Sequence, residues 1–293
     1  MKAIILAGGN GTRLYPITQV VTKQLMPVYD KPMIFYSISI LMLAGIKEIL
    51  LICRDIDLEN FKNLLGDGKH LGIDISYKVQ NQPNGLPEAF IIGKEFINNE
   101  NVCLILGDNL FYGDLSWFKE SIIEQENTKK GGFIFGYHVS DPRSYGVLEF
   151  NRSNGKIISI EEKPENPKSN LAIPGLYLFD GTVSQRAENL KPSKRGELEI
   201  TDIMQSYFNE GSLLARQIGR GVAWLDTGTP RSLIDASAYI AAIEARQNLK
   251  VACLEEVAYR KGFIDKSQLE NRIQSLPNCS YRSYLETLVS QNL

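Results

Sequence analysis

The chain has 293 residues, of which 43% are hydrophobic, so it can bury one large core or a main core with a smaller lobe. Its formal net charge is −2, with 32 basic and 34 acidic residues, which excludes a global positive field for binding nucleic acid or an anionic membrane. Four widely spaced cysteines and only two histidines argue against disulfides and a structural zinc site.

The first half of the chain alternates short apolar runs with longer amphipathic ones, the pattern of a parallel sheet covered by helices. The expected strands are Lys2–Ala7, Glu48–Cys53, Ile73–Val79, Val102–Leu106 and Gly132–His138. The expected helices between them are Pro32–Ala44, Leu58–Leu65, Pro87–Ile97 and Leu115–Gln125. The first apolar run is too short for a signal peptide, and no later one approaches membrane-spanning length. We therefore expect a cytoplasmic protein without a membrane partner.

From Tyr145 the sequence becomes richer in β-type segments. It predicts strands at Gly146–Phe150, Lys156–Glu162 and Leu171–Phe179, a turn at Ser153-Asn154-Gly155, a helix at Ile200–Asn209, a strand at Leu213–Ile218 and a helix at Arg231–Gln247. A C-terminal segment with a helical pattern follows. Because we find no repeat and no linker, we expect residues 1–293 to form one domain. The expected fold class is α/β: a Rossmann-like, mixed but mostly parallel sheet flanked by helices, with a smaller β-rich lobe and a helical C-terminal segment.

Three unusual loops follow predicted strands: Gly8–Leu14, Gln80–Leu86 and Gly107–Gly113. Sheets of this kind bind ligands at the carboxyl ends of their strands. The sequence therefore predicts that these three loops share one site.

The segment Gly8-Gly9-Asn10-Gly11-Thr12-Arg13-Leu14 favours a phosphate loop, because its glycines let backbone N–H groups approach a phosphate and Arg13 adds a positive charge. It matches neither the dinucleotide fingerprint nor a Walker loop, which argues against hydride transfer and P-loop hydrolysis. Taken alone, it is also compatible with a tight turn that binds no ligand.

Lys23 precedes a proline in irregular sequence and is a candidate for binding the same phosphates, with an ordinary surface charge as the alternative.

Later motifs supply candidates for a base, a metal ion and a second substrate. Gln80 offers a donor and an acceptor to a base edge such as uracil or thymine, although turn chemistry alone also explains Pro83-Asn84-Gly85. Asp108 and Asp226 lie beyond apolar segments and are hard oxygen ligands suited to Mg²⁺, or else ordinary turn residues. Glu162 and Lys163 end a strand, where they indicate either a sugar-phosphate contact or a solvated charge run.

Taken in order, these motifs resemble the sugar nucleotidyltransferases. The resemblance rests on Gly8–Leu14, Lys23-Gln24, Gly107-Asp108-Asn109, Glu162-Lys163-Pro164 and Trp224-Leu225-Asp226-Thr227-Gly228. A closer similarity, to the members that join dTTP and glucose 1-phosphate at the start of dTDP-rhamnose synthesis, rests on Tyr29-Asp30-Lys31-Pro32-Met33, Arg195–Asp202 and Arg260–Asp265. The match runs from Met1 to about Asp265.

The resemblance implies Mg²⁺-dependent in-line displacement that gives dTDP-glucose and pyrophosphate. It implies catalytic roles for Arg13, Lys23 and Lys163, and Mg²⁺ bound by Asp108 and Asp226. The implied nucleotide-binding residues are Leu6, Gly8, Gly9, Gly11, Thr12, Arg13, Gln80, Pro83, Gly85 and Asp108. The implied sugar-binding residues are Asn109, Tyr145, Gly146, Glu162, Lys163, Ile173, Arg195 and Trp224. The corresponding parts of the domain are residues 1–140 for the nucleotide, 141–229 for the sugar and 230–293 for the helical segment.

The implied chemistry agrees with the composition. A sugar phosphate is already anionic at neutral pH, so no general base is needed and the scarcity of histidine is no objection. The main alternatives are the same reaction with UTP, since uracil and thymine differ by one methyl group, and a non-catalytic sugar-nucleotide sensor. The presence of both Asp108 and Asp226 favours the enzyme. The resemblance also implies a homotetramer, with the helical tail packed against another subunit.

Overall fold

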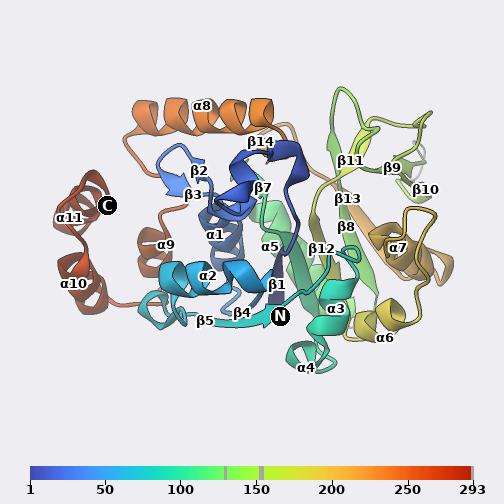
Figure 1. Cartoon of the computed structure of the whole chain (residues 1–293), viewed down its shortest axis with the longest axis horizontal. Coiled ribbons are helices and arrows are strands. Elements are labelled where there is room, and N and C mark those ends of the chain that lie inside the picture. Colours follow the sequence, from blue (N-terminus) through green and yellow to red (C-terminus); the bar gives the residue numbers. More distant parts are fainter. Residues whose placement is uncertain (129–130, 152–154, 292–293) are drawn as a thin grey trace.

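The computed structural model describes residues 1–128, 131–151 and 155–291. Within them, the main sheet has ten strands in the order β10-β9-β11-β8-β12-β6-β1-β4-β5, with β13 beside β8 (Figure 1). Their bounds are β1 Lys2–Ala7, β4 Glu48–Cys53, β5 Asp74–Val79, β6 Val102–Leu106, β8 Gly132–His138, β9 Gly146–Phe150, β10 Ile157–Glu162, β11 Leu171–Ile173, β12 Leu176–Phe179 and β13 Leu213–Gln217. The pairings make β10, β11 and β12 run against the other seven. The predicted mixed sheet is thus confirmed, with seven of its ten strands running in one direction.

Helices cover both faces of this sheet. Their bounds are α1 Ile34–Ala44, α2 Leu58–Leu65, α3 Glu88–Ile92, α4 Lys94–Ile97, α5 Ser116–Thr128, α6 Val183–Glu188, α7 Ile200–Asn209, α8 Pro230–Gln247, α9 Leu254–Arg260, α10 Lys266–Ser275 and α11 Ser280–Gln291. Single-turn 3₁₀ segments occur at Thr12–Leu14, Ile17–Gln19, Lys23–Leu25, Asp55–Asp57 and Lys69–Leu71. Two small antiparallel ribbons complete the fold: β2 Pro27–Val28 with β3 Lys31–Pro32, and β7 Asn109–Gly113 with β14 Val222–Asp226.

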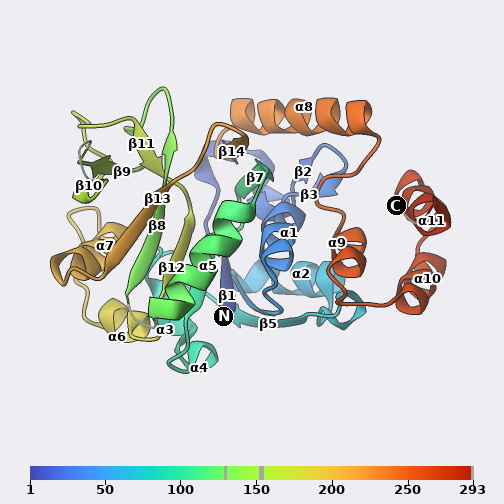
Figure 2. The ribbon, with the colours of Figure 1, turned by 180° about the vertical axis from the view of Figure 1, so that it is seen from behind.

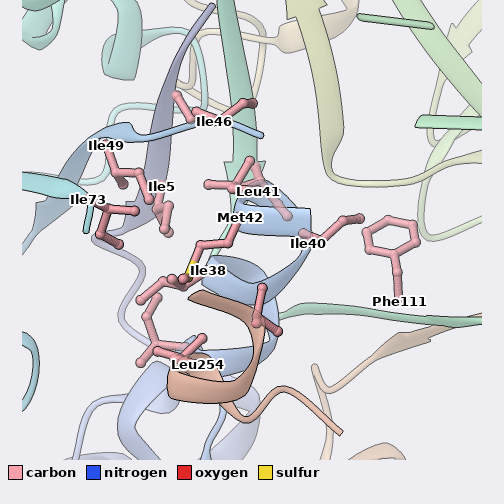
Figure 3. Close-up of a cluster of buried hydrophobic side chains, with 14 of the residues drawn as sticks. Ile5, Ile38, Ile40, Leu41, Met42, Ile46, Ile49, Ile73, Phe111 and Leu254 are labelled. Carbon is pink, nitrogen blue, oxygen red and sulfur yellow. The ribbon is translucent and has the colours of Figure 1, made fainter. Parts of the chain in front are cut away.

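The alternation of side chains along β1 explains the two hydrophobic layers. Ile5 belongs to the cluster that includes residues of α1, α5 and α9, whereas its neighbour Ile4 belongs to the cluster with α3, α6 and α7. Both side chains are fully buried, because a central parallel strand is covered on both faces. Figure 2 shows α5 crossing the sheet on one side, and Figure 3 shows Ile38, Leu41 and Met42 of α1 near Ile5.

The C-terminal helices pack on α9 through buried carboxylates. Glu255 accepts hydrogen bonds from Arg272 Nε at 3.1 Å and from the Tyr281 hydroxyl at 2.6 Å, while Glu256 accepts one from Tyr284. These contacts anchor α10 and α11 at one end of the molecule, far from β9 and β10 in Figure 1. The predicted helical C-terminal segment is confirmed.

Four local predictions were wrong or incomplete. The strand predicted at Leu171–Phe179 is divided into β11 and β12, because Pro174 lacks an N–H and that of Gly175 bonds to the Asn109 side chain. The helix predicted at Pro87–Ile97 is divided into α3 and α4 at Gly93, a weak helix former. Residues from Asn109 in the predicted loop form β7, whose partner β14 is remote in sequence.

The fourth is the short helix α6, which was not predicted. Smaller differences concern element ends: α1 begins at Ile34 rather than Pro32, α5 extends to Thr128, and β10 begins at Ile157. Ser153 and Asn154 of the predicted turn lie outside the described residues. In the described part of the chain, no helix is both long and apolar enough to span a bilayer.

Candidate active site

A cavity of about 650 Å³ lies at the carboxyl ends of β1, β5 and β6. Residues from all three loops that the sequence places there line it, together with residues of the β-rich half. The predicted site residues in its wall are Leu6, Gly9, Arg13, Gln80, Pro83, Gly85, Asp108, Asn109, Tyr145, Gly146, Glu162, Lys163, Ile173, Trp224 and Asp226. Gly8, Gly11, Thr12, Lys23 and Arg195 do not line the wall but lie in or beside the segments that build it.

Arg13 lies in the 3₁₀ turn Thr12–Leu14 that ends the phosphate-loop candidate. Its guanidinium reaches the segment after β14: a Cβ on Gly228 would lie 2.8 Å from Arg13 Nη2 and 2.9 Å from Asp226 Oδ1. Glycine at position 228 therefore leaves room for the Arg13 guanidinium and the Asp226 carboxylate, both of which border this position. Among the described residues, Arg13 forms no ion pair, so its charge is available to an anionic ligand.

Lys23 is buried beneath the pocket rather than exposed on a surface, with 6% of its area accessible. Its ammonium forms an ion pair with Asp108, and Asn109 Nδ2 donates to the other carboxylate oxygen at 2.9 Å. Burial alone would raise the pKa of Asp108, but the Lys23 charge and these hydrogen bonds outweigh it and lower that pKa. Asp108 is therefore held as a carboxylate at neutral pH.

Asp226 is brought beside Asp108 by the β7–β14 ribbon, in which Asp226 is the register partner of Asn109. The Asn109 side chain holds this corner together, because its Oδ1 accepts from Gly175 N at 3.0 Å and from Trp224 Nε1 at 2.7 Å. The Tyr145 hydroxyl donates to Asp226 Oδ2 at 3.2 Å. Burial, followed by the nearby Asp226 charge, raises the pKa of Tyr145 to about 12, so the phenol remains a donor.

Gln80 follows β5 and is almost fully buried. An ideal Cβ on Gly8 would lie 2.0 Å from Gln80 Oε1, so the absence of a side chain at position 8 leaves room for the Gln80 amide. Gly85 pairs with Leu198 in a parallel bridge, and a Cβ on it would lie 2.0 Å from Leu198 O. With φ of +114°, position 85 also requires glycine.

Glu162 and Lys163 end β10 on the other side of the pocket. The Glu162 carboxylate accepts from the Thr201 hydroxyl, and its Oε1 lies 3.3 Å from Arg195 Nη2 and 3.4 Å from Lys163 Nζ. Arg195 also donates to Glu199 Oε2 at 2.7 Å, so its guanidinium joins two carboxylates. Arg195 thus links the Glu162 and Glu199 carboxylates in the wall. The Lys163 side chain remains 43% exposed.

Several wall residues had not been predicted as site residues. They are Gln24, Leu86, Leu106, Arg143, Ser144, Gly175, Tyr177, Glu197, Leu198, Glu199, Ile200 and Met204. Some had a signal, because Glu197–Ile200 belong to the motif that begins at Arg195, and Arg143 and Ser144 directly precede Tyr145. Leu106 and Tyr177 look like ordinary strand residues, and nothing in their local sequence distinguishes them.

The donor set for a metal ion consists of two carboxylates. No cluster of three or more His, Cys, Asp or Glu side chains suited to a metal occurs in the described residues. Asp108 and Asp226 therefore fit an ion that completes its coordination with water and substrate oxygens, as Mg²⁺ does, and do not fit a closed structural zinc site.

Comparisons with known proteins show the family of this chain. The model of the nucleotidyl transferase family matches residues 2–243, and the chain belongs to that family. It is 51% identical over 291 residues to a glucose-1-phosphate thymidylyltransferase of Neisseria meningitidis, covering 99% of this chain and 100% of the relative. It is 50% identical over 292 residues to the enzyme of that name from Mycobacterium tuberculosis, with full coverage of both.

Solved structures show the same fold. A Bacillus anthracis protein described as a candidate glucose-1-phosphate thymidylyltransferase, in complex with a sucrose, superposes with a TM-score of 0.76 at 40% identity, over 82% of this chain and 94% of that one. A UDP-glucose pyrophosphorylase complexed with UDP-glucose gives a TM-score of 0.73 at 26% identity, over 83% and 98%.

Proposed function

We propose that this protein is a glucose-1-phosphate thymidylyltransferase, which transfers a thymidylyl group from dTTP to glucose 1-phosphate and releases pyrophosphate. The observation that carries this proposal is the meeting of Arg13, Asp108, Lys163 and Asp226 in one cavity at the carboxyl edge of the sheet. The full-length similarity to enzymes of that name supports the choice of substrates.

The reaction brings a triphosphate and a phosphate monoester together, so its main obstacle is charge repulsion. Arg13 would bind the triphosphate, and Lys23 would hold Asp108 in place while contributing its charge. Lys163 would bind the phosphate of the sugar from the opposite wall. A Mg²⁺ ion held by Asp108 and Asp226 would supply further neutralisation of the phosphate oxygens. The remaining residues orient: Gln80 and Gly85 the base, and Glu162, Asn109 and Tyr145 the sugar.

A direct assay tests the activity. With glucose 1-phosphate and Mg²⁺, we expect pyrophosphate release with dTTP at a kcat/KM at least about tenfold above that with UTP. Chelation of Mg²⁺ by excess EDTA should stop the reaction, and added Mg²⁺ should restore it. Turnover with UTP equal to or above that with dTTP would instead make the protein a uridylyltransferase. No turnover with either nucleotide would leave the alternative of a non-catalytic sugar-nucleotide sensor.

We also propose a homotetramer. Its support in this chain is exposed apolar surface, with Ile234 and Tyr239 on α8 at 64% and 36% exposure and Val20 at 90%. Light scattering should give a mass about four times that of the chain, whereas a monomer mass at assay concentration would contradict the proposal.

All four cysteines are free, which agrees with a reducing cytoplasm, the compartment we propose.

Within the single domain, we assign residues 1–140 to the nucleotide, 141–229 to the sugar and 230–293 to the helical segment. The Gly85–Leu198 bridge supports treating the first two parts as one unit, because it joins the turn after β5 to the segment before α7.

A further inference from the structure

We propose that Glu88 is a positioning residue that fixes the orientation of the Gln80 amide and thereby selects thymine or uracil against cytosine. This inference rests on the proposed function, because it assigns Gln80 to the base. It adds a residue outside the cavity wall, at the start of α3, that determines which hydrogen-bonding atom the wall presents.

The contacts around Glu88 define that orientation. Gln80 Nε2 donates to Glu88 Oε2 at 2.6 Å. The same carboxylate accepts from Asn84 Nδ2 at 2.8 Å and from Asn84 N at 3.3 Å. One half-buried carboxylate therefore holds both the amide of Gln80 and the turn that carries Gly85.

The carboxylate allows only one orientation of the amide. An ionised carboxylate accepts hydrogen bonds and cannot donate them, so the NH₂ group of Gln80 must face Glu88. A flipped amide would set its carbonyl oxygen against the carboxylate and leave two acceptors facing each other. The Oε1 atom is thus directed away from Glu88 and lies over Gly8, where no described residue donates a hydrogen bond to it.

This arrangement determines what the site recognises. With its NH₂ group turned toward Glu88, Gln80 directs its carbonyl acceptor toward the base. Thymine and uracil carry an N–H at N3 that can satisfy this acceptor, whereas cytosine has a lone pair at N3. Two acceptors facing each other in a buried site are unfavourable, so cytosine is rejected. Without Glu88 the amide is free to rotate and to offer its NH₂ group instead.

The test compares kcat/KM for dTTP and dCTP, each with glucose 1-phosphate, in wild-type protein and in Glu88→Ala. We expect the dTTP-to-dCTP ratio to fall at least about tenfold in Glu88→Ala, mainly through KM. Glu88→Gln replaces the carboxylate by an amide that can donate as well as accept, so Gln80 can adopt either orientation and the ratio should fall between the values of wild type and Glu88→Ala. Gln80→Ala, which lacks the amide, sets the value for complete loss of this contact.

Two further variants separate orientation from structure. Asn84→Ala removes a side-chain donor from Glu88 but leaves the Gln80 contact, so turnover can fall while the ratio is kept. Glu95→Ala removes a carboxylate on α4 that pairs with the exposed Lys78, and it should change neither quantity. An unchanged ratio in Glu88→Ala, whether both activities fall equally or neither falls, would overturn the inference. A wild-type protein that does not use dTTP would instead overturn the proposed function.

Discussion

Replacing Lys163 by methionine is expected to lower kcat/KM for glucose 1-phosphate by about 100-fold, while direct binding of dTTP stays within about twofold. Methionine retains most of the length of the side chain, an unbranched chain one atom shorter, and removes its charge. The loss should therefore fall on glucose 1-phosphate, the substrate whose phosphate we propose that Lys163 binds. Steady-state kinetics and calorimetric titration with dTTP measure the two quantities separately.

The backbone makes this prediction specific to Lys163. Its φ of +41° is unusual for a residue other than glycine, and its N–H donates to Tyr145 O at 3.1 Å. The main chain therefore holds the lysine at the pocket, where its side chain has a distant contact with Glu162. Lys168→Met is a control, because Lys168 is also exposed, at 57% against 43% for Lys163, and pairs with Glu161 outside the cavity wall. Equal losses for both substrates would place Lys163 on the nucleotide side.

The parallel half of the sheet could be predicted because each of its strands can be recognised from its own residues and the turns beside it. The strands β1, β4 and β6 have the predicted bounds, since each is a short apolar run between turn signals. The shared edge followed from the same pattern, because parallel strands bring their carboxyl ends together. The pattern predicts that Gln80 and Asp108 share this edge, and both line the one cavity there.

What the local pattern could not reveal depends on partners distant in sequence. The ribbon of β7 and β14 joins Asn109 to Asp226, and no window of sequence contains both. The burial of Lys23 is similar, because its isolated motif looks like a surface charge until Asp108 is placed against it. Glu88 was missed because a glutamate at the start of a helix is ordinary, and only its contact with Gln80 distinguishes it.

The largest effects are expected at the carboxylate pair. Asp108→Ala and Asp226→Ala should each lower kcat by about 100-fold or more, because both side chains are asked to hold one ion beside the reacting phosphates. Asp108→Asn and Asp226→Asn should behave similarly while preserving side-chain shape. Asp74→Asn is the control, since Asp74 begins β5 at the opposite edge of the sheet and pairs with the exposed Lys69.

Folding must be measured alongside activity, because the two carboxylates have different partners. Loss of Asp108 leaves the buried Lys23 ammonium without its ion-pair partner, which can cost about 3–5 kcal/mol of stability. Loss of Asp226 removes the acceptor of the Tyr145 hydroxyl, a smaller change. Thermal unfolding should therefore show Asp108→Ala as the less stable variant, and kinetics should be run well below its transition.

The double variant decides whether the two residues act as a unit. If both bind the same ion, removing either abolishes productive binding, and the second substitution adds little to a loss of about 100-fold. If each carboxylate acted independently, the losses would multiply to about 10,000-fold. The measurement is a double-mutant cycle on pyrophosphate release at saturating Mg²⁺. Multiplying losses, or near-normal activity in either single variant, would show that the two carboxylates do not share an ion, and the charge of the phosphates would then be met mainly by Arg13, Lys23 and Lys163.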